Sequence, residues 1–196
     1  MNTTKIRHIL TFWFDDSPRP GSEYGQQRQV WFKKDPTFDE QIRQNFLADY
    51  HQAASGQLQD WQQEPQSCLA LILLLDQFPR NLFRGDPRSF ATDAQALATA
   101  EYGLEQGFDQ ALLPVERLFF YLPLEHCELL AQQERCVSLV QALCNQHPEF
   151  ESSLDYAHRH RDVIQQFGRF PHRNEILGRQ TTEAEAEFFQ QPGSRF

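Results

Sequence analysis

The sequence predicts an all-α protein of about eight to ten helices, and three observations support this fold class. Apolar residues recur every four positions at Phe38, Ile42, Phe46 and Tyr50, which is the spacing of one face of a helix. Leucine outnumbers the β-branched residues in the longest apolar run. No segment combines strand-like alternation with a hairpin turn signal. We therefore expect a single all-helical domain covering residues 1–196.

The first third of the chain is predicted to alternate helices with loops. Residues 6–14 are apolar and aromatic, which favours a helix, whereas residues 15–25 carry the prolines and glycines of a loop. Thr37 and Glu40 have the spacing of a capping box, which predicts the start of the helix that carries the aromatic stripe. Gly56 predicts the end of that helix.

Residues 68–75 form the longest purely apolar run. Pro65 lies just before it, as is common at the first turn of a helix. Apolar residues on all sides would bury such a helix on most of its faces. A strand of a parallel sheet is the competing interpretation. The run is far shorter than the roughly 18 to 20 residues that cross a bilayer, so we expect no membrane partner.

The second half of the chain continues the helical pattern. Pro123 is expected to kink or break the helix in which it lies, and glycines at 107 and 168 to follow helix ends. Thr182 and Glu185 have capping-box spacing and predict a short last helix to residue 190. The predicted helices before it are residues 91–106, residues 115–122, residues 124–146 as one helix or two, and residues 150–167.

Charge and cysteine content restrict the function classes. The net charge of -9 disfavours non-specific nucleic-acid binding and docking on an anionic membrane. Cys68, Cys127, Cys136 and Cys144 form no CxxC pair and lie in apolar surroundings, so we expect reduced thiols. The N-terminus shows no signal peptide, and the expected location is therefore the cytoplasm.

Two segments do not look like ordinary connections. Residues 76–85, the first Phe-Pro segment, and residues 167–179, the second, each contain Phe-Pro, then Arg-Asn, then an apolar pair and another arginine. In both, proline is predicted to stop a helix and phenylalanine to anchor the chain, while arginine presents a fork of donors suited to carboxylate or phosphate. If the two segments met, their arginines would line a basic cleft that captures an anionic ligand.

A second interpretation of these segments stays open. Arginine near a helix C-terminus complements the helix dipole and bonds to the last carbonyls. The chain has 27 acidic residues, among them Asp76 and Glu175 within the segments, and the arginines could pair with these carboxylates instead of a ligand.

Histidines and acidic residues between the two segments suggest acid–base chemistry or hydrogen bonding. Glu125 and His126 could transfer protons near neutral pH. The chain has neither HExxH nor Glu-x-x-His, so we expect no metal and no cofactor. His158 and His160 are two residues apart on a helix, which predicts that one faces inward and the other faces solvent.

Three long motifs, taken in order, resemble the domain of unknown function 924 family. They are residues 73–81, 120–128 and 167–174, with further matches at residues 12–14, 31–32, 38–39 and 181–183. The resemblance implies an all-helical fold of the tetratricopeptide-repeat-like α-α superhelix class, and it implies no activity. The family often has Met and Ser in place of Glu125 and Cys127 around a shared His126, which favours His126 and Glu128 as site residues. Its pattern aligns with His160 rather than His158.

The leading functional hypothesis is the binding of a small phosphate- or carboxylate-bearing ligand in a cleft lined by Arg, His and Asn. Whether a reaction follows is left open, with His126, His160 and His172 as candidate proton carriers. The alternative is a protein- or peptide-interaction module of the tetratricopeptide-repeat-like class. The candidate ligand-binding residues are Asp76, Arg80, Asn81, Arg84, Tyr121, Glu128, Arg169, Arg173, Asn174 and Arg179.

Overall fold

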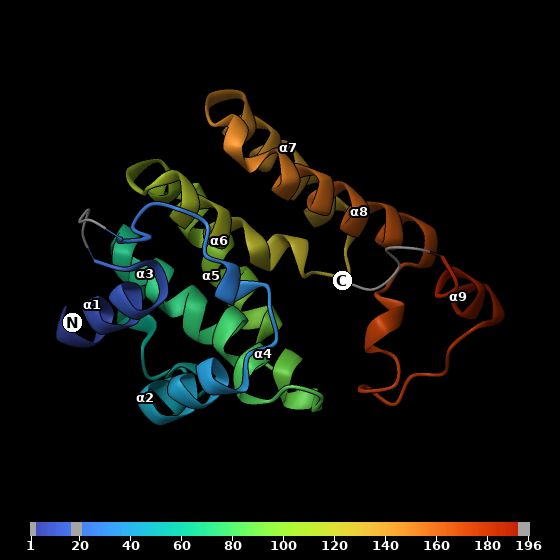
Figure 1. Cartoon of the computed structure of the whole chain (residues 1–196), viewed down its shortest axis with the longest axis horizontal. Helices are drawn as coiled ribbons and strands as arrows, with labels where there is room; N and C mark the ends of the chain where they lie inside the picture. The colour runs from blue at the N-terminus through green and yellow to red at the C-terminus, as the bar shows by residue number, and fades with distance from the viewer. Residues whose placement is uncertain (1–2, 17–20, 192–196) are drawn as a thin grey trace. The chain divides into compact units, whose positions relative to one another are not determined.

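A computed structural model describes residues 3–16 and 21–191 of the chain (Figure 1). Every regular element in these residues is an α-, 3₁₀- or π-helix, and none is a strand. The predicted all-α class is therefore confirmed, and the number of α-helices agrees with the prediction. The superhelical arrangement stays a prediction. Of the helices in the described ranges, none is both long enough and apolar enough to cross a membrane.

The chain divides into two compact units. Unit 1 consists of residues 1–84 and 88–123, and unit 2 of residues 85–87 and 124–196. Helix α6 (Pro114–Glu125) belongs to unit 1 up to Pro123 and ends two residues into unit 2. The prediction of a single domain over residues 1–196 stays a prediction.

Unit 1 packs around a cluster of aromatic rings. Trp13 meets Phe119 edge-on with ring centroids 5.6 Å apart and lies 5.4 Å from Phe78, which is 5.0 Å from Phe46. All four side chains are buried, so they supply much of the apolar area that stabilises the unit. The helices that contribute to unit 1 besides α6 are α1 (Thr3–Phe14), α2 (Pro36–Ala54), α3 (Pro65–Ile72), α4 (Phe78–Leu82) and α5 (Asp93–Glu105).

The start of α2 corrects one prediction. Asp35, not Thr37, is the N-cap, and its carboxylate accepts hydrogen bonds from the backbone N–H groups of Thr37 at 2.8 Å and Phe38 at 3.2 Å. Asp35 followed by Pro36 is a stronger start signal than the predicted capping box, because proline's fixed φ suits the first helical position. Gly56 follows the end of α2 with a φ of +77°, as predicted.

The apolar run at residues 68–75 is helical and buried, as predicted, but the helix does not stop at Pro79. A π-helical turn, Leu73–Gln77, leads directly into α4, in which Pro79 occupies the first turn. Proline offers no N–H to the carbonyl of Leu75. The Thr92 hydroxyl donates to that carbonyl instead, at 2.5 Å. The π turn and the Thr92 hydroxyl, which replaces the missing N–H, explain why the chain stays helical through Pro79.

The predicted loop at residues 15–25 has no helix in its described part, residues 15–16 and 21–25. Residues 17–20 of that loop lie outside the described residues.

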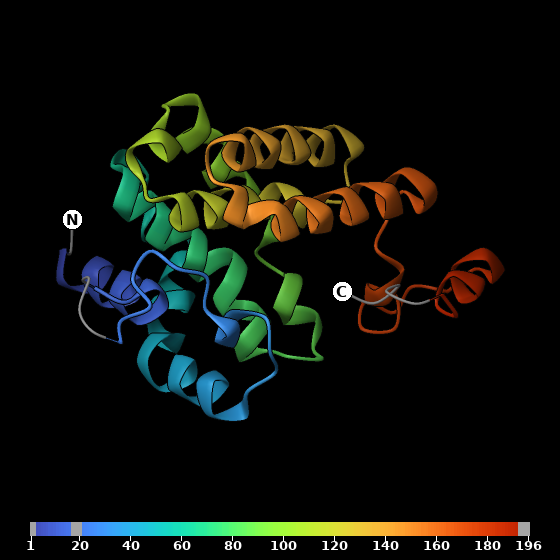
Figure 2. The same cartoon turned by 45° about the horizontal axis from the view of Figure 1, so that its top comes forward.

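Unit 2 is built on two helices, α7 (Leu130–Gln146) and α8 (Glu151–Phe167), which run antiparallel side by side (Figures 1 and 2). The predicted helical stretch at residues 124–146 is one helix preceded by a loop, and α6 continues past Pro123 to Glu125 rather than breaking there. Gly168 ends α8 with a φ of +67°. The capping box predicted from Thr182 and Glu185 opens α9 (Glu183–Phe188).

Candidate functional site

The two Phe-Pro segments lie in different units. Except for Gly85, the first segment belongs to unit 1, and the whole second segment belongs to unit 2. Their convergence on one cleft stays a prediction, so the two segments are described in turn.

In the first segment, Arg80 is held by two carboxylates. Its Nη1 and Nη2 atoms lie 3.0 and 3.2 Å from the two oxygens of Asp93, and Nη1 lies 3.5 Å from Asp76 Oδ1. The Asp76 side chain is fully buried, and Gln77 donates to its other oxygen at 2.5 Å. Burial alone would lower the pKa of Arg80, but the two carboxylates outweigh it and raise that pKa. Arg80 therefore neutralises a carboxylate inside unit 1.

Asp39 on α2 binds the other polar side chains of the first segment. Arg84 donates to both of its oxygens at 2.8 Å, and Asn81 donates at 2.7 Å. Burial would raise the pKa of Asp39, yet these bonds lower it. The first segment thus forms the arrangement that the second interpretation predicts, in which the arginines pair with carboxylates.

Tyr121 lies in unit 1 with one partner a turn earlier on α6, Arg117, and one that the sequence did not indicate, Asp109. Its hydroxyl donates to Asp109 at 2.7 Å and accepts from Arg117 at 3.3 Å. Burial raises the pKa of Tyr121 well above its usual value. No spacing rule links residues 109 and 121, which belong to separate helical elements.

In the second segment, a carboxylate and a guanidinium fix the backbone of Phe170. Glu128 accepts from the Phe170 N–H at 2.8 Å and from Arg179 Nη1 at 2.8 Å, and Arg179 Nη2 donates to the Phe170 carbonyl at 2.9 Å. Burial would raise the pKa of Glu128, but these bonds lower it. Glu128 lies in the loop after α6, so it does not share a helical face with Tyr121.

Glu185 holds two further residues of the second segment. Arg169 donates to its two oxygens at 2.6 and 2.9 Å, and Asn174 donates to it at 3.2 Å. The hydrogen bond from Arg169 is the main cause that lowers the pKa of Glu185 to about 2. Glu185 also closes the capping box of α9, and it therefore joins the second segment to that helix.

Arg173 has different surroundings from the other arginines of the segments. Its Cζ atom lies 4.7 Å from the ring centroid of Phe170, and its Nη2 donates to the His126 carbonyl at 3.0 Å. The rings of His160 and His172 each lie 5.5 Å from the same phenylalanine ring. We call these residues, Phe170, Arg173, His126, His160 and His172, the Phe170 cluster.

His160 is oriented by two acceptors. Its Nδ1 atom lies 2.9 Å from the Tyr156 carbonyl and 3.5 Å from a carboxylate oxygen of Glu125. Nδ1 therefore carries the hydrogen, which leaves the lone pair on Nε2. The thiol of Cys136 lies 4.0 Å from the other oxygen of Glu125. Burial raises the pKa of Cys136 well above its usual value, so this thiol is not an activated nucleophile. Of the histidine pair, His160 is the one that faces inward, as predicted for one of the two, while His158 is half-buried.

Both histidines with shifted pKa values are neutral at pH 7. Burial lowers the pKa of His160 to about 3, helped by the positive charges of neighbouring groups that include Arg173. Burial and the Arg173 charge lower the pKa of His172 to about 4. Arg173 is 6% exposed and its guanidinium stays charged, so the cluster has a buried positive charge beside two neutral imidazoles. In the described part of the chain, no group of three or more metal-ligating side chains is found.

Comparison with known proteins places the chain in a family. The model of a family described as bacterial protein of unknown function (DUF924) matches residues 9–193. A solved structure, that of the protein of unknown function ATU0120 from Agrobacterium tumefaciens, is similar with 38% identity and a TM-score of 0.84, covering 97% of this chain and 99% of that one. No curated protein matches. The chain belongs to the DUF924 family of bacterial proteins of unknown function.

Proposed function

We propose that the Phe170 cluster of unit 2 binds a small anion carrying a phosphate or carboxylate group, with Arg173 as the main donor. One observation carries this proposal, namely that a buried guanidinium and two imidazoles gather around a single phenylalanine ring. A guanidinium binds both oxygens of such an anion at once, and the half-buried His172 can add a further N–H, whereas the N–H of neutral His160 is used by the Tyr156 carbonyl.

The contrast among the segment arginines supports Arg173 as the ligand-binding residue. Arg80, Arg84, Arg169 and Arg179 each contact a carboxylate of their own unit within 3.0 Å. The hydrogen bond of Arg173 instead joins it to a main-chain carbonyl, and its flat face covers Phe170. Arg173 also interacts electrostatically with Glu128, so what distinguishes it from the other four is its stacked guanidinium beside His172.

The lowered histidine pKa values also favour an anionic ligand. Protonation of His172 or His160 adds positive charge close to Arg173, which is one reason why their pKa values are low. A bound anion would reverse this electrostatic term and raise both pKa values. By linkage, the anion would bind more tightly as the pH falls from 7 towards 5, because the complex takes up protons.

The burial of the cluster favours a small ligand over a peptide. Arg173 and His160 are almost inaccessible, while His126 and His172 are half-buried and offer the accessible edge. A peptide carboxylate would reach this site only with its last atoms. The cytoplasmic location stays a prediction. The proposal includes no reaction.

Histidine NMR titration tests the proposal most directly. We would record imidazole resonances of the full chain from pH 4 to 8 with inorganic phosphate or with chloride at matched ionic strength. We expect phosphate to raise the pKa of His172 above its value in chloride. Equal titration curves for His172 in the two salts would overturn the proposal.

Thermal unfolding with phosphate, phosphate esters and small carboxylates gives a second readout. A ligand at 100 times its dissociation constant stabilises the folded state by about 2.7 kcal/mol. We expect this stabilisation in the wild type and a loss of most of it in Arg173→Gln and His172→Gln. Arg159→Gln, a substitution of an exposed arginine on α8, is the matched control and should keep it. The half-buried His172 keeps the test valid if Arg173→Gln folds poorly.

A further inference from the structure

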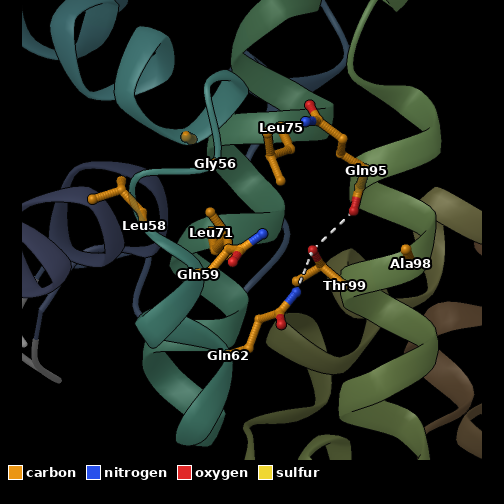
Figure 3. Close-up of a pocket in the computed structure, with 10 residues that line it drawn as sticks. Gly56, Leu58, Gln59, Gln62, Leu71, Leu75, Gln95, Ala98 and Thr99 are labelled. Atoms are coloured by element: carbon orange, nitrogen blue, oxygen red, sulfur yellow. Dashed lines mark hydrogen bonds between the residues drawn. The ribbon is translucent and has the colours of Figure 1, made fainter.

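A pocket in unit 1 has a chemistry unlike that of the Phe170 cluster. Its volume is about 160 Å³, and Figure 3 shows it between the end of α2, the 3₁₀-helix Gln59–Gln63, α3 and α5. A cavity of about this size is large enough for a six-membered ring. The residues that line it are Ala53, Gly56, Leu58, Gln59, Gln62, Leu71, Leu75, Gln95, Ala98 and Thr99.

All ten lining residues are uncharged, although the protein carries a net charge of -9. A charged ligand would lose its hydration here without gaining an opposite charge, which is costly. Leu58, Leu71 and Leu75 supply an aliphatic wall. The pocket therefore selects an uncharged molecule with one apolar face.

Amide groups supply the polar side of the pocket. Gln62 Nε2 donates to Thr99 Oγ1 at 3.2 Å, and Thr99 donates in turn to the Gln95 carbonyl at 2.8 Å (Figure 3). This chain of bonds fixes the Gln62 amide, whose oxygen can still accept and whose second N–H can still donate. Gln59 is exposed, so its amide is hydrated and can exchange water for a ligand.

We propose that this pocket binds a flat, uncharged molecule with an amide-type edge, in which a donor and an acceptor lie side by side as in a pyrimidine base. Such an edge pairs with the donor and acceptor of one glutamine amide, while the ring packs against the three leucines. The site is independent of the proposed anion site, because all of its residues lie in unit 1.

Two pairs of substitutions separate the pocket from the helices around it. Ala98→Leu places a larger side chain in the pocket, and Ala94→Leu makes the same change one turn earlier on α5 at an exposed residue that does not line it. Gln62→Leu removes the fixed amide, and Gln63→Leu changes its exposed neighbour. All but Gln62 are exposed and Gln62 is half-buried, so these variants should fold.

The measurement is an NMR titration of the full chain with uracil. Benzene and orotate serve as control probes: benzene has no amide-type edge, and orotate has that edge but carries a negative charge. We expect uracil to shift the side-chain amide signals of Gln59 and Gln62 saturably, and to bind at least tenfold more tightly than either other probe. Ala98→Leu and Gln62→Leu should weaken uracil binding at least tenfold, and their two controls should not. No saturable shift, equal binding of benzene or orotate, or full binding by Ala98→Leu would each overturn the proposal.

Discussion

The two Phe-Pro segments contain the same residue types in the same order but have different backbones and different electrostatics. In the first, Phe78, Pro79, Arg80 and Asn81 all lie in α4. In the second, Phe170 is extended, and a single 3₁₀ turn, Pro171–Arg173, follows it. The shared residues therefore do not determine the local conformation.

The residues just before each Phe-Pro pair explain the difference. Gly168 adopts a left-handed conformation that ends α8 before Phe170 is reached. The first segment has no glycine at that place, so the helix continues, and the π turn with the Thr92 hydroxyl accommodates Pro79. We therefore expect Gly168 to be the main reason why the second Phe-Pro pair is not helical.

The electrostatic difference is as large as the difference in backbone. Arg80 lies between the carboxylates of Asp76 and Asp93, and its charge is compensated. Arg173 lies beside His172 and over Phe170, and its charge suppresses protonation of its neighbours. Arginine in the first segment therefore serves stability, and we assign the binding role to the second.

The largest effect is expected from Arg80→Leu, which leaves the buried Asp76 carboxylate without its cation. Loss of one partner from a buried ion pair costs about 3 to 5 kcal/mol. Arg84→Leu is the matched control, because Arg84 is 36% exposed and such pairs contribute about 1 kcal/mol or less. Urea unfolding of both variants measures the difference. Equal losses of unfolding free energy in the two variants would show that the buried ion pair of Arg80 contributes no more than the exposed one of Arg84.

Acidification should weaken unit 2 through its histidines. His172 and His160 have an ordinary pKa of 6.5 when unfolded and pKa values of about 4 and about 3 when folded. Below pH 6.5 the unfolded chain binds more protons than the folded one, so stability present above that pH is lost as the pH falls. Each histidine contributes a slope of about 1.4 kcal/mol per pH unit between pH 6 and 4.5.

Urea unfolding at several pH values in this range measures that slope. His172→Gln should reduce the slope by about one proton's contribution, or about 1.4 kcal/mol per pH unit. Arg159→Gln, at an exposed residue of α8 that does not titrate in this range, is the control and should leave the slope unchanged. If His172→Gln left the slope of stability against pH unaltered, this result would contradict the low pKa of His172.

Thr92→Val tests how the first segment stays helical at Pro79. The substitution removes the hydroxyl that donates to the Leu75 carbonyl and leaves a buried acceptor without its donor, which costs about 1 to 3 kcal/mol. Pro79→Ala restores a backbone N–H four residues after that carbonyl. The double variant should therefore recover part of the stability in urea unfolding. If the stability change of the double variant equals the sum of the two single changes, the Thr92 hydroxyl does not act in place of the N–H that Pro79 lacks.

The smallest effect is expected from Gly168→Ala. The open space around Gly168 rules out a steric clash, so the cost comes from the φ of +67° alone and is about 1 kcal/mol. Gly168→Asn should cost less, because asparagine tolerates this conformation better. Differential scanning calorimetry of the two variants checks the order. A neutral alanine variant would show that the glycine does not determine the start of the second segment.

Much of the helical framework could be predicted because its signals are local. The stripe from Phe38 to Tyr50, the capping box of Thr182 and Glu185, and the helix end at Gly168 each depend on residues a few positions apart. Predictions failed where a neighbouring signal was stronger, as at Asp35, or where a distant group replaced a missing bond, as at Pro79.

The partners of the site residues could not be predicted in the same way. Asp39 meets Arg84 across 45 residues, Glu128 meets Arg179 across 51, and no helical period connects such positions. The candidate set therefore included arginines that stabilise the fold together with the one for which we propose a binding role, since all of them lie in the two Phe-Pro segments.

The sequence by itself determined the helical class and most helix ends, because backbone preference and apolar periodicity act over one or two turns. Only the tertiary structure decided which charged and aromatic groups surround each arginine. The free energy of a guanidinium depends on which carboxylates and rings lie within a few ångströms of it, and packing of distant segments brings Asp93 to Arg80 but His126 to Arg173. The same motif therefore stabilises one unit, and in the other it forms the buried positive charge at which we propose that an anion binds.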